Sequence, residues 1–264
     1  DEVHVDKKWF YMTEDGQSFI LAADEELPQR KVRHKGYITK VMFLCAQARP
    51  RVVQGTYWDG KIGIWPIGRM TPAPQTSVNR PAGTMVWHNE TVDRDKYRQM
   101  MISEVLPAII ATFPWQYLTT KEKQVFIQQD GAKSHIEEDD EEWLQAVEDC
   151  GVNIKLCTQP AQSPDLNIND LAFFRSIMSL KIQSAPKTTL ELIAAVQKSY
   201  DEYPPLKINR MWLSLQQVMN EIIKDRGGND YKLQHMGKEK LEQEGRLPVV
   251  LPVVEDIDEF LEFL

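Results

Sequence analysis

The sequence is poor in cysteine, lacks any long hydrophobic run and carries no excess of positive charge. Its 264 residues include 3 cysteines, which are Cys45, Cys150 and Cys157. They form no cluster, so the sequence excludes a disulfide-stabilised scaffold and a cysteine zinc site and favours a reducing compartment. No apolar run approaches the roughly 18 residues of a transmembrane helix, and the first residues resemble neither a signal nor a transit peptide. We therefore expect no membrane partner.

The net charge of −8 argues against a broad nucleic-acid-binding surface, because phosphate binding needs clustered Lys and Arg. The charge is uneven, however: residues 29–35 are basic, whereas residues 137–142 and the C-terminal tail are acidic. Four basic side chains of the first segment are candidate DNA contacts, namely Arg30, Lys31, Arg33 and Lys35. A solvated loop explains the same segment equally well.

The composition is that of a globular protein, with 42% hydrophobic and 27% charged residues. Such a chain can bury a sizeable core. It begins almost inside a predicted strand and without an initiator Met, so we expect a fragment or a processed piece.

The hydrophobic pattern predicts strands that alternate with helices. Apolar runs and alternation predict strands at 3–12, 37–48, 61–67, 125–130 and 152–157. Caps and helical periodicity predict helices at 91–112, 138–149, 163–180, 188–203, 209–226 and 231–243. The stretch 68–90 is rich in Pro, Thr and Asn and is expected to be an extended loop, and 18–36 is expected to be a polar arm. This order predicts an α/β protein with one mixed, five-stranded sheet flanked by helices.

One strand ends at an acid, in the run from Val125 to Asp130 with Gly131 behind it. Open α/β sheets place their chemistry at this end of a strand, although an acid here also caps many helices. Two further acids favour the first interpretation. Asp6 lies inside the strand at 3–12, and Asp170 lies early in the helix that begins at Ser163.

Three carboxylates on two strands and one helix could bind a pair of divalent metal ions. Two such ions can activate the nucleophile and stabilise the leaving oxygen in phosphodiester cleavage, and Mg²⁺ needs few protein ligands beyond carboxylates. We assign the bridging position to Asp6, with Asp130 and Asp170 each completing one ion. The 39 residues between Asp130 and Asp170 suffice for a helix, a strand and a return to the same edge. Asp165 competes for the third position, but it suits the first turn of a helix.

These residues form three motifs that resemble the catalytic domain of mariner-type transposases. The motifs are Val3-His4-Val5-Asp6-x-Lys8-Trp9, Gln129-Asp130-x-Ala132-x-x-His135 and Ser163-Pro164-Asp165-Leu166-Asn167-Ile168-x-Asp170-Leu171. The 39-residue interval resembles the three-aspartate subgroup of plants and related lineages. The similarity includes Ser77 to Gly83 and extends to about Pro248, so it covers nearly the whole chain.

The resemblance implies a ribonuclease-H-like fold and cut-and-paste transposition with two Mg²⁺ or Mn²⁺ ions. It implies that Asp6, Asp130 and Asp170 are the catalytic, metal-binding triad. It also implies a nuclear protein that forms a homodimer and acts on transposon ends and target DNA, without a small-molecule substrate. The expected parts are a catalytic core at 1–183, with the arm at 18–36 reaching DNA or a partner subunit, C-terminal helices at 184–248 packed on that core, and an acidic amphipathic tail at 249–264. Arg80 is a further candidate DNA contact.

The chain departs from the family pattern in three respects. No helix-turn-helix module for end recognition is present in the sequence, Lys7 stands where an acid usually follows the first Asp, and Gly131 stands where Asn usually follows the second. The alternative is therefore a catalytically silent derivative that acts as a DNA- or protein-interaction module. His135 could contact a phosphate or a carboxylate of the metal site, but a structural role at a helix start is favoured. Trp9 and Trp65 are expected to be core residues.

Overall fold

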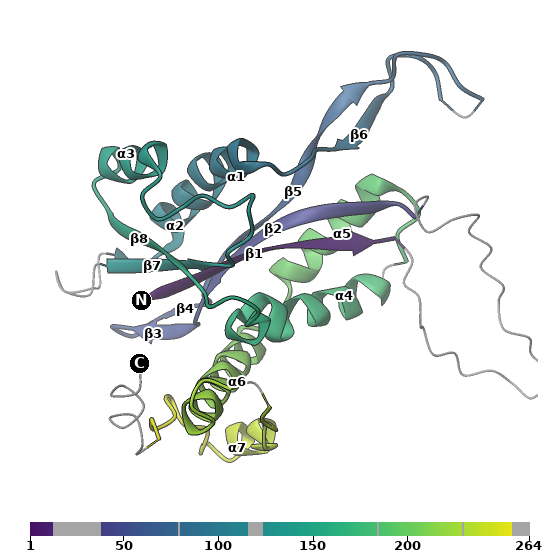
Figure 1. Cartoon of the computed structure of the whole chain (residues 1–264). Helices are drawn as coiled ribbons and strands as arrows, with labels where there is room; N and C mark the ends of the chain where they lie inside the picture. Colours follow the sequence, from purple (N-terminus) through teal and green to yellow (C-terminus); the bar gives the residue numbers. More distant parts are fainter. Residues whose placement is uncertain (13–37, 79, 116–123, 184, 229, 255–264) are drawn as a thin grey trace, which may run out of the picture.

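The computed structural model describes residues 1–12, 38–78, 80–115, 124–183, 185–228 and 230–254 (Figure 1). The predicted arm at 18–36, with its candidate DNA contacts Arg30, Lys31, Arg33 and Lys35, lies outside the described residues, as do the last ten residues of the predicted tail. No described helix is long and apolar enough to span a bilayer.

A mixed sheet of six strands forms the centre of the molecule, in the order β6-β5-β2-β1-β7-β8. Its strands are β1 (Glu2–Tyr11), β2 (Lys40–Ala48), β5 (Lys61–Pro72), β6 (Met85–Asn89), β7 (Gln124–Gln129) and β8 (Asn153–Thr158). β1 runs antiparallel to β2 and parallel to β7, and β8 continues parallel to β7. This arrangement confirms the predicted α/β class, and β1 lies at the centre of the sheet as predicted.

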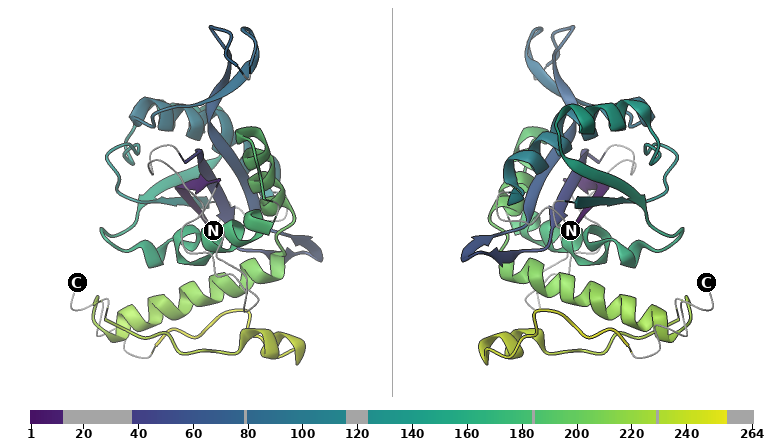
Figure 2. Two further views of the ribbon diagram at one scale, coloured as in Figure 1. Left: turned by 90° about the vertical axis from the view of Figure 1, so that its right-hand side faces the viewer. Right: turned by 90° about the vertical axis from the view of Figure 1, so that its left-hand side faces the viewer.

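The sixth strand corrects the prediction that residues 68–90 form a loop. β5 continues through Pro66 and Gly68 to Pro72, and its pairing with β6 begins at Gly68 opposite Asn89. Pro66 lies where only β2 pairs with β5, so its missing N–H is tolerated. A Cβ on Gly68 would overlap the His88 carbonyl, so this glycine permits close strand pairing and does not end the strand. The resulting hairpin projects from the body (Figures 1 and 2).

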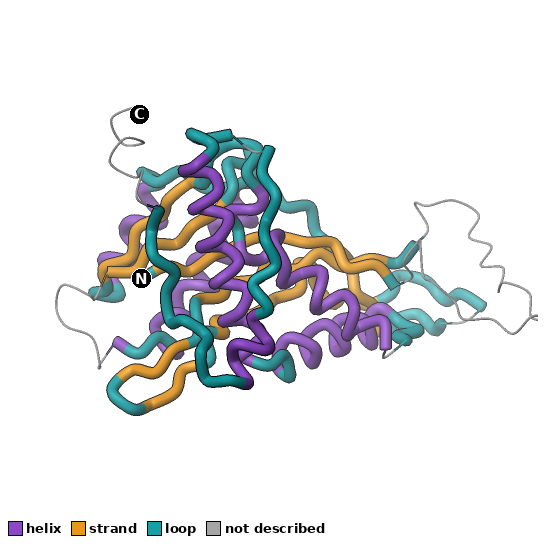
Figure 3. Tube along the Cα trace, turned by 90° about the horizontal axis from the view of Figure 1, so that it is seen from below, coloured by secondary structure: helices purple, strands orange, loops and turns teal. Residues whose placement is uncertain are grey.

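Helices cover both faces of the sheet. One face carries α1 (Arg94–Met100), the π-helix η2 (Met101–Val105), α2 (Leu106–Thr112) and α3 (Glu141–Asp149). The other carries the π-helix η5 (Asn169–Phe173), α4 (Phe174–Gln183), α5 (Thr189–Asp201) and α6 (Pro205–Lys224). Seen from below in Figure 3, helices cross in front of part of the strands. Outside these layers are the short hairpin of β3 (Arg51–Val53) and β4 (Thr56–Trp58), the 3₁₀ turn η4 (Pro164–Leu166), and α7 (Lys238–Gln243).

Two predicted helices differ from the structure. The helix expected at 163–180 is divided into η4, η5 and α4, and the helix expected at 231–243 is limited to α7. The first is interrupted because Asn167 and Asn169 hydrogen-bond to the sheet. Local periodicity cannot reveal bonds to residues more than 160 positions away.

Alternation along the strands decides which side chains face which helices. In β2, Leu44 contributes to the core under α1–α3, whereas Phe43 contributes to the core under α4–α6. In β1, Val5 faces α1–α3 and Phe10 faces α4–α6. Because successive residues of a strand point to opposite faces, Asp6 and Lys8 share the face of Phe10, while Lys7 shares that of Val5.

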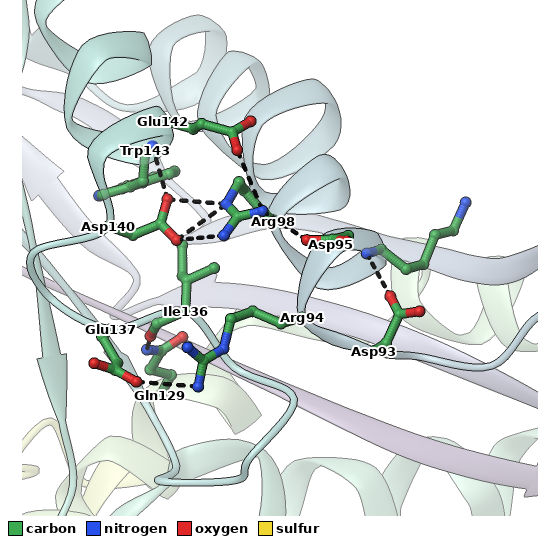
Figure 4. Close-up of polar contacts among 11 residues, drawn as sticks. Asp93, Arg94, Asp95, Arg98, Gln129, Ile136, Glu137, Asp140, Glu142 and Trp143 are labelled. Atoms are coloured by element: carbon green, nitrogen blue, oxygen red, sulfur yellow. Dashed lines mark hydrogen bonds and ion pairs between the residues drawn. The ribbon is translucent and has the colours of Figure 1, made fainter.

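The loop that follows β7 ends at an ion pair that connects α1 with the start of α3 (Figure 4). Arg98 Nη2 of α1 lies 2.8 Å from Asp140 Oδ2, and Asp140 also caps α3 by accepting a hydrogen bond from Trp143 N at 3.1 Å. Closer to β7, Gln129 Nε2 donates to the Ile136 carbonyl at 2.6 Å. Both ends of the segment that contains Asp130 and His135 are therefore fixed.

The two tryptophans singled out in the sequence take different positions. Trp65 packs against the core under α1–α3, as expected of a core residue. Trp9 is half-buried, and the Lys40 ammonium lies 4.2 Å from the centre of its ring.

Candidate active site

Asp6 is a buried carboxylate in the central strand, with 5% of its surface exposed. Its Oδ1 accepts a hydrogen bond from the Lys7 backbone N–H at 2.6 Å. Its Oδ2 is buried and has no hydrogen-bond partner in the described part of the chain. Burial, and next the negative charge of Asp170, raise the pKa of Asp6 to about 8, and the charge of Asp130 adds to the effect. A buried carboxylate oxygen without a donor is a position suited to a cation.

Asp130 follows the last residue of β7 and is held by its own loop. Its Oδ1 lies 2.6 Å from His135 Nδ1 and accepts a hydrogen bond from the Ala132 N–H at 3.1 Å. The hydrogen bond with His135 is the largest cause that lowers the pKa of Asp130; burial opposes it, and the charge of Lys7 contributes a smaller lowering. Asp130 is therefore an ionised, oriented carboxylate that is partly open to solvent.

His135 is almost fully buried and its ring stacks on Tyr97, with the ring centres 4.1 Å apart. Its Nδ1 also lies 2.8 Å from the Asp130 carbonyl oxygen. The ring therefore orients Asp130 from behind and is not exposed to a ligand.

Asp170 lies in the first turn of η5, and a network of hydrogen bonds fixes this turn on β1. Asn167 Nδ2 donates to the Val5 carbonyl and Asn169 Nδ2 donates to the His4 carbonyl, both at 3.1 Å. The Ile168 N–H donates to His4 Nδ1 at 3.0 Å. Because these bonds engage the two residues that precede Asp6, they place Asp170 beside Asp6.

The structure thus brings together the three acids predicted from sequence. Asp130 and Asp170 both act on the pKa of Asp6 through their charges, which requires the three carboxyls to share one region. In the described part of the chain, no three His, Cys, Asp or Glu side chains have the spacing of a formed metal site. Lys8 Nζ lies 2.8 Å from Asp170 Oδ1, and His135 Nδ1 lies 2.6 Å from Asp130 Oδ1.

The donor set nevertheless fits a hard divalent cation. Oxygen ligands from three carboxylates, one of them buried with an unpartnered oxygen, match the preference of Mg²⁺ or Mn²⁺. Asp6, Asp130 and Asp170 would hold the ion or ions.

Two lysines beside Asp6 were not assigned a role from sequence. Lys8 pairs with Asp170 on the Asp6 face. Lys7 lies on the opposite face, where its Nζ donates to Ser134 Oγ at 2.8 Å and lies 5.2 Å from the centre of the Tyr97 ring. Burial lowers the pKa of Lys7, and the charges of Asp130 and Asp6 oppose this effect. Strand alternation from Asp6 is the signal that could have placed Lys8 next to the acids.

The remaining sequence candidates lie elsewhere. Asp165, the competing third acid, is in η4 and accepts a hydrogen bond from the Tyr231 hydroxyl. Arg80 lies in the connection between β5 and β6, where its backbone pairs with that of Ser77. The structure does not bring either residue into the carboxylate group.

Comparison with known proteins gives matches at the level of structure alone. No family model matches the chain, and a search of curated proteins gives no match. Among solved structures, the chain is similar to the Mos1 mariner paired end complex with Mn, with a TM-score of 0.53, 15% identity, and coverage of 88% of this chain and 56% of that one. A pre-cleavage Mos1 transpososome gives a TM-score of 0.54, 15% identity, and coverage of 88% and 57%. The Mos1 strand transfer complex gives a TM-score of 0.54 and 15% identity, with coverage of 88% of this chain and 56% of that one.

The chain spans somewhat more than half the length of these Mos1 chains. At such low identity the similarity concerns the fold. The mixed sheet flanked by helices is therefore the ribonuclease-H-like fold of the Mos1 transposase catalytic domain, as the resemblance in the sequence implied.

Proposed function

We propose that this chain is the catalytic domain of a mariner-type DNA transposase of the three-aspartate type. The observation that carries the proposal is the meeting of Asp6, Asp130 and Asp170 in one region of a ribonuclease-H-like fold. The sequence motifs support the same three residues, and the strand order and the fold comparison support the same scaffold.

The three acids have environments suited to different parts of metal binding. Asp6 is buried and central, so it suits a ligand shared by two ions. Asp130 is partly exposed and oriented by His135, and Asp170 is oriented by the turn from Asn167 to Asn169. Two divalent ions, when bound, would supply activation of the attacking oxygen and stabilisation of the leaving oxygen. The chain itself supplies preorganisation, since Asp6 lies in β1, Asp170 lies in η5, and Asp130 directly follows β7 and is held by His135 and the Ala132 N–H.

DNA as the substrate follows from the same proposal. The structurally similar Mos1 assemblies are a paired end complex, a transpososome and a strand transfer complex. By analogy we propose transposon ends and target DNA as partners, cut-and-paste transposition through nicking and strand transfer, a homodimer, and action in the nucleus. The basic residues at 30–35 and Arg80 are proposed DNA contacts within that assembly.

The alternative is a catalytically silent derivative that acts as an interaction module. The ion pair of Lys8 with Asp170 is compatible with it. Retention of all three acids, together with the side chains that orient Asp130 and Asp170, supports the catalytic interpretation more strongly.

Nicking of supercoiled DNA by the full-length protein, with Mg²⁺ or Mn²⁺, tests the proposal. We expect Asp6→Asn, Asp130→Asn and Asp170→Asn each to reduce the rate by at least about 10³-fold, because each removes a charged ligand from the reacting centre. Asp165→Asn is the matched control and should retain activity, since Asp165 bonds Tyr231. Undiminished nicking in Asp130→Asn would refute the proposed assignment.

A further inference from the structure

Lys8 makes a contact that a metal ion would have to break. Its ammonium lies 2.8 Å from Asp170 Oδ1, so it holds one oxygen of a proposed metal ligand. The side chain lies on the same face of β1 as Asp6, and its ammonium is 5.7 Å from the centre of the Phe174 ring. The Lys8 ammonium therefore supplies positive charge beside the three acids.

The ion pair between Lys8 and Asp170 can be replaced by a contact between Asp170 and a metal ion. The Lys8 side chain is 42% exposed and that of Asp170 is 29% exposed, so solvent screens their attraction. A lysine also has a flexible four-carbon stem, which lets the ammonium move into solvent while the stem stays on an apolar surface. A divalent ion that takes Asp170 would repel the ammonium from its present position.

Lys7 differs in each of these respects. Its ammonium is half-buried, donates to Ser134 and lies over Tyr97 on the opposite face of the strand. In the described part of the chain its ammonium bonds Ser134 and no carboxylate oxygen, whereas its backbone N–H donates to Asp6 Oδ1. Of the two lysine ammonium groups, it is that of Lys8 that holds a proposed ligand, through a weak and accessible pair.

We propose that Lys8 is an exchangeable counter-cation: it neutralises Asp170 in the metal-free protein, leaves when a divalent ion binds, and then contacts a phosphate of the DNA substrate. The inference rests on the proposed function, because it takes Asp170 as a metal ligand. Lys8 is a positioning residue before the ion binds and a substrate contact afterwards. A phosphodiester that reaches the carboxylates meets the freed ammonium, and Lys–phosphate pairs are a common form of backbone recognition.

Binding of Mn²⁺ alone to the full-length protein, without DNA, tests the first half of the proposal. Titration calorimetry or electron paramagnetic resonance should show Lys8→Gln binding Mn²⁺ about two- to fivefold more tightly than wild type, which is the size expected when a competing exposed ion pair is removed. Lys8→Arg keeps the positive charge and should restore an affinity close to that of wild type. Lys240→Gln is the control, because Lys240 forms an exposed ion pair with Glu244, at 3.9 Å, at the end of α7.

DNA binding at saturating Mn²⁺ tests the second half. Lys8→Gln should raise the Kd for DNA about three- to tenfold and reduce the magnitude of the slope of log K against log salt by about one, because one phosphate contact is lost. Lys240→Gln should leave both values unchanged. Opposite effects of one substitution on metal and on DNA are not expected from a purely structural residue.

The outcomes separate this inference from the proposed function. If wild type binds Mn²⁺, Asp170→Asn abolishes binding, and Lys8→Gln binds no more tightly than Lys240→Gln, then the role of Lys8 is overturned and the metal site stands. If neither wild type nor Lys8→Gln binds Mn²⁺, both the inference and the proposed function are overturned. Tighter Mn²⁺ binding with unchanged DNA affinity would overturn the phosphate contact.

Discussion

At the scale of single residues, His135 shows how a buried ring can act on an exposed ligand. Its Nδ1 contacts both the carboxylate and the carbonyl of Asp130, at 2.6 and 2.8 Å, while Tyr97 stacks on its face. Sequence reasoning left two roles open for His135. The structure favours orientation of Asp130, because its ring is surrounded by protein.

Replacing His135 should therefore change the titration of Asp130. In His135→Gln we expect the pKa of Asp130 to rise toward its usual value, because the hydrogen bond with His135 is the largest cause of its lowering. Carboxyl carbon chemical shifts measured against pH give the value directly. We also expect a loss of metal affinity of about 10- to 100-fold, as for other side chains that orient a ligand.

Ser134→Ala is the control for that experiment, since Ser134 contacts Lys7 and not the Asp130 carboxylate. An unchanged pKa of Asp130 in His135→Gln would show that the ring does not control this acid.

The ionised Asp6 carboxylate should lower the free energy of unfolding when no metal is bound. Its folded pKa of about 8 lies above the value of an unfolded Asp, so the folded state favours the protonated form. The resulting stability is present below pH 4 and is lost as pH rises toward 8. At pH 8 with a chelator, Asp6→Asn should be more stable than wild type by roughly 1–3 kcal/mol, because a buried, partly unpaired charge is removed.

Urea unfolding at pH 4 and pH 8 measures this difference, and it should be small at the lower pH. A less stable Asp6→Asn at pH 8 would mean that the wild-type carboxylate is better paired than the structure indicates.

At the scale of elements, sequence patterns located β1, β2, β7, β8, α3 and α5 because each carries its own periodicity, cap or stop. The turn that positions Asp170 could not be located in this way. Its geometry depends on contacts of Asn167 and Asn169 with β1, and of Gln47 with Asn169 at 2.9 Å. Motif spacing selected the three acids and His135 as candidates, whereas it could not reveal the contacts of Asn167 and Asn169 that position Asp170.

Asn169 is the centre of that turn, so its removal should affect both stability and the metal site. Asn169→Ala leaves the His4 carbonyl and the Gln47 amide without their partner. We expect a loss of unfolding free energy of roughly 1–3 kcal/mol. We also expect weaker Mn²⁺ binding, because Asp170 follows directly in the chain.

Ser179→Ala is a matched control on the next helix, where Ser179 bonds only the Arg175 carbonyl of its own helix. Equal Mn²⁺ affinities in Asn169→Ala and Ser179→Ala would show that the network supports the fold without positioning the ligand.

The ion pair between Arg98 and Asp140 should make the free energy of unfolding depend on pH. The hydrogen bond with Arg98 is the largest cause that lowers the pKa of Asp140. Such a group stabilises the fold above the pKa of an unfolded Asp, and this contribution is lost as pH falls below about 4. Because Asn also caps helices well, Asp140→Asn isolates the charge. It should cost roughly 1–2 kcal/mol at pH 7 and almost nothing at pH 2.5.

Thermal or urea unfolding at the two pH values checks this expectation. Asp95→Asn is the control, since Asp95 also pairs with Arg98 but its side chain is 89% exposed. If Asp140→Asn lost the same unfolding free energy at both pH values, the loss would come from the helix cap and not from the ion pair with Arg98.

At the scale of the whole molecule, both faces of the sheet need helices to bury them. The pattern predicted a sheet with helices on it, but not that β5 and β6 extend into a hairpin or that η5 is a π-helix. The division of the chain at residue 183 stays a prediction. The core under α4–α6 contains Phe43 of β2 together with Val196 of α5 and Leu215 of α6. Figure 2 shows α6 as a long helix beneath the sheet.

A chain that ends at residue 183 should therefore fail to fold cooperatively. It would lack α5 and α6 and would expose buried residues of β1 and β2, among them Phe10, Phe43 and Cys45. Exposure of several large apolar side chains removes about 1.5–3 kcal/mol each, and a domain is stable by only about 5–15 kcal/mol. Calorimetry should show one transition for the full chain and none for residues 1–183, whereas a chain that ends at residue 254 keeps both cores and should unfold like the full chain. A cooperative transition in residues 1–183 would instead establish an independent catalytic core, with the C-terminal helices as an addition to it.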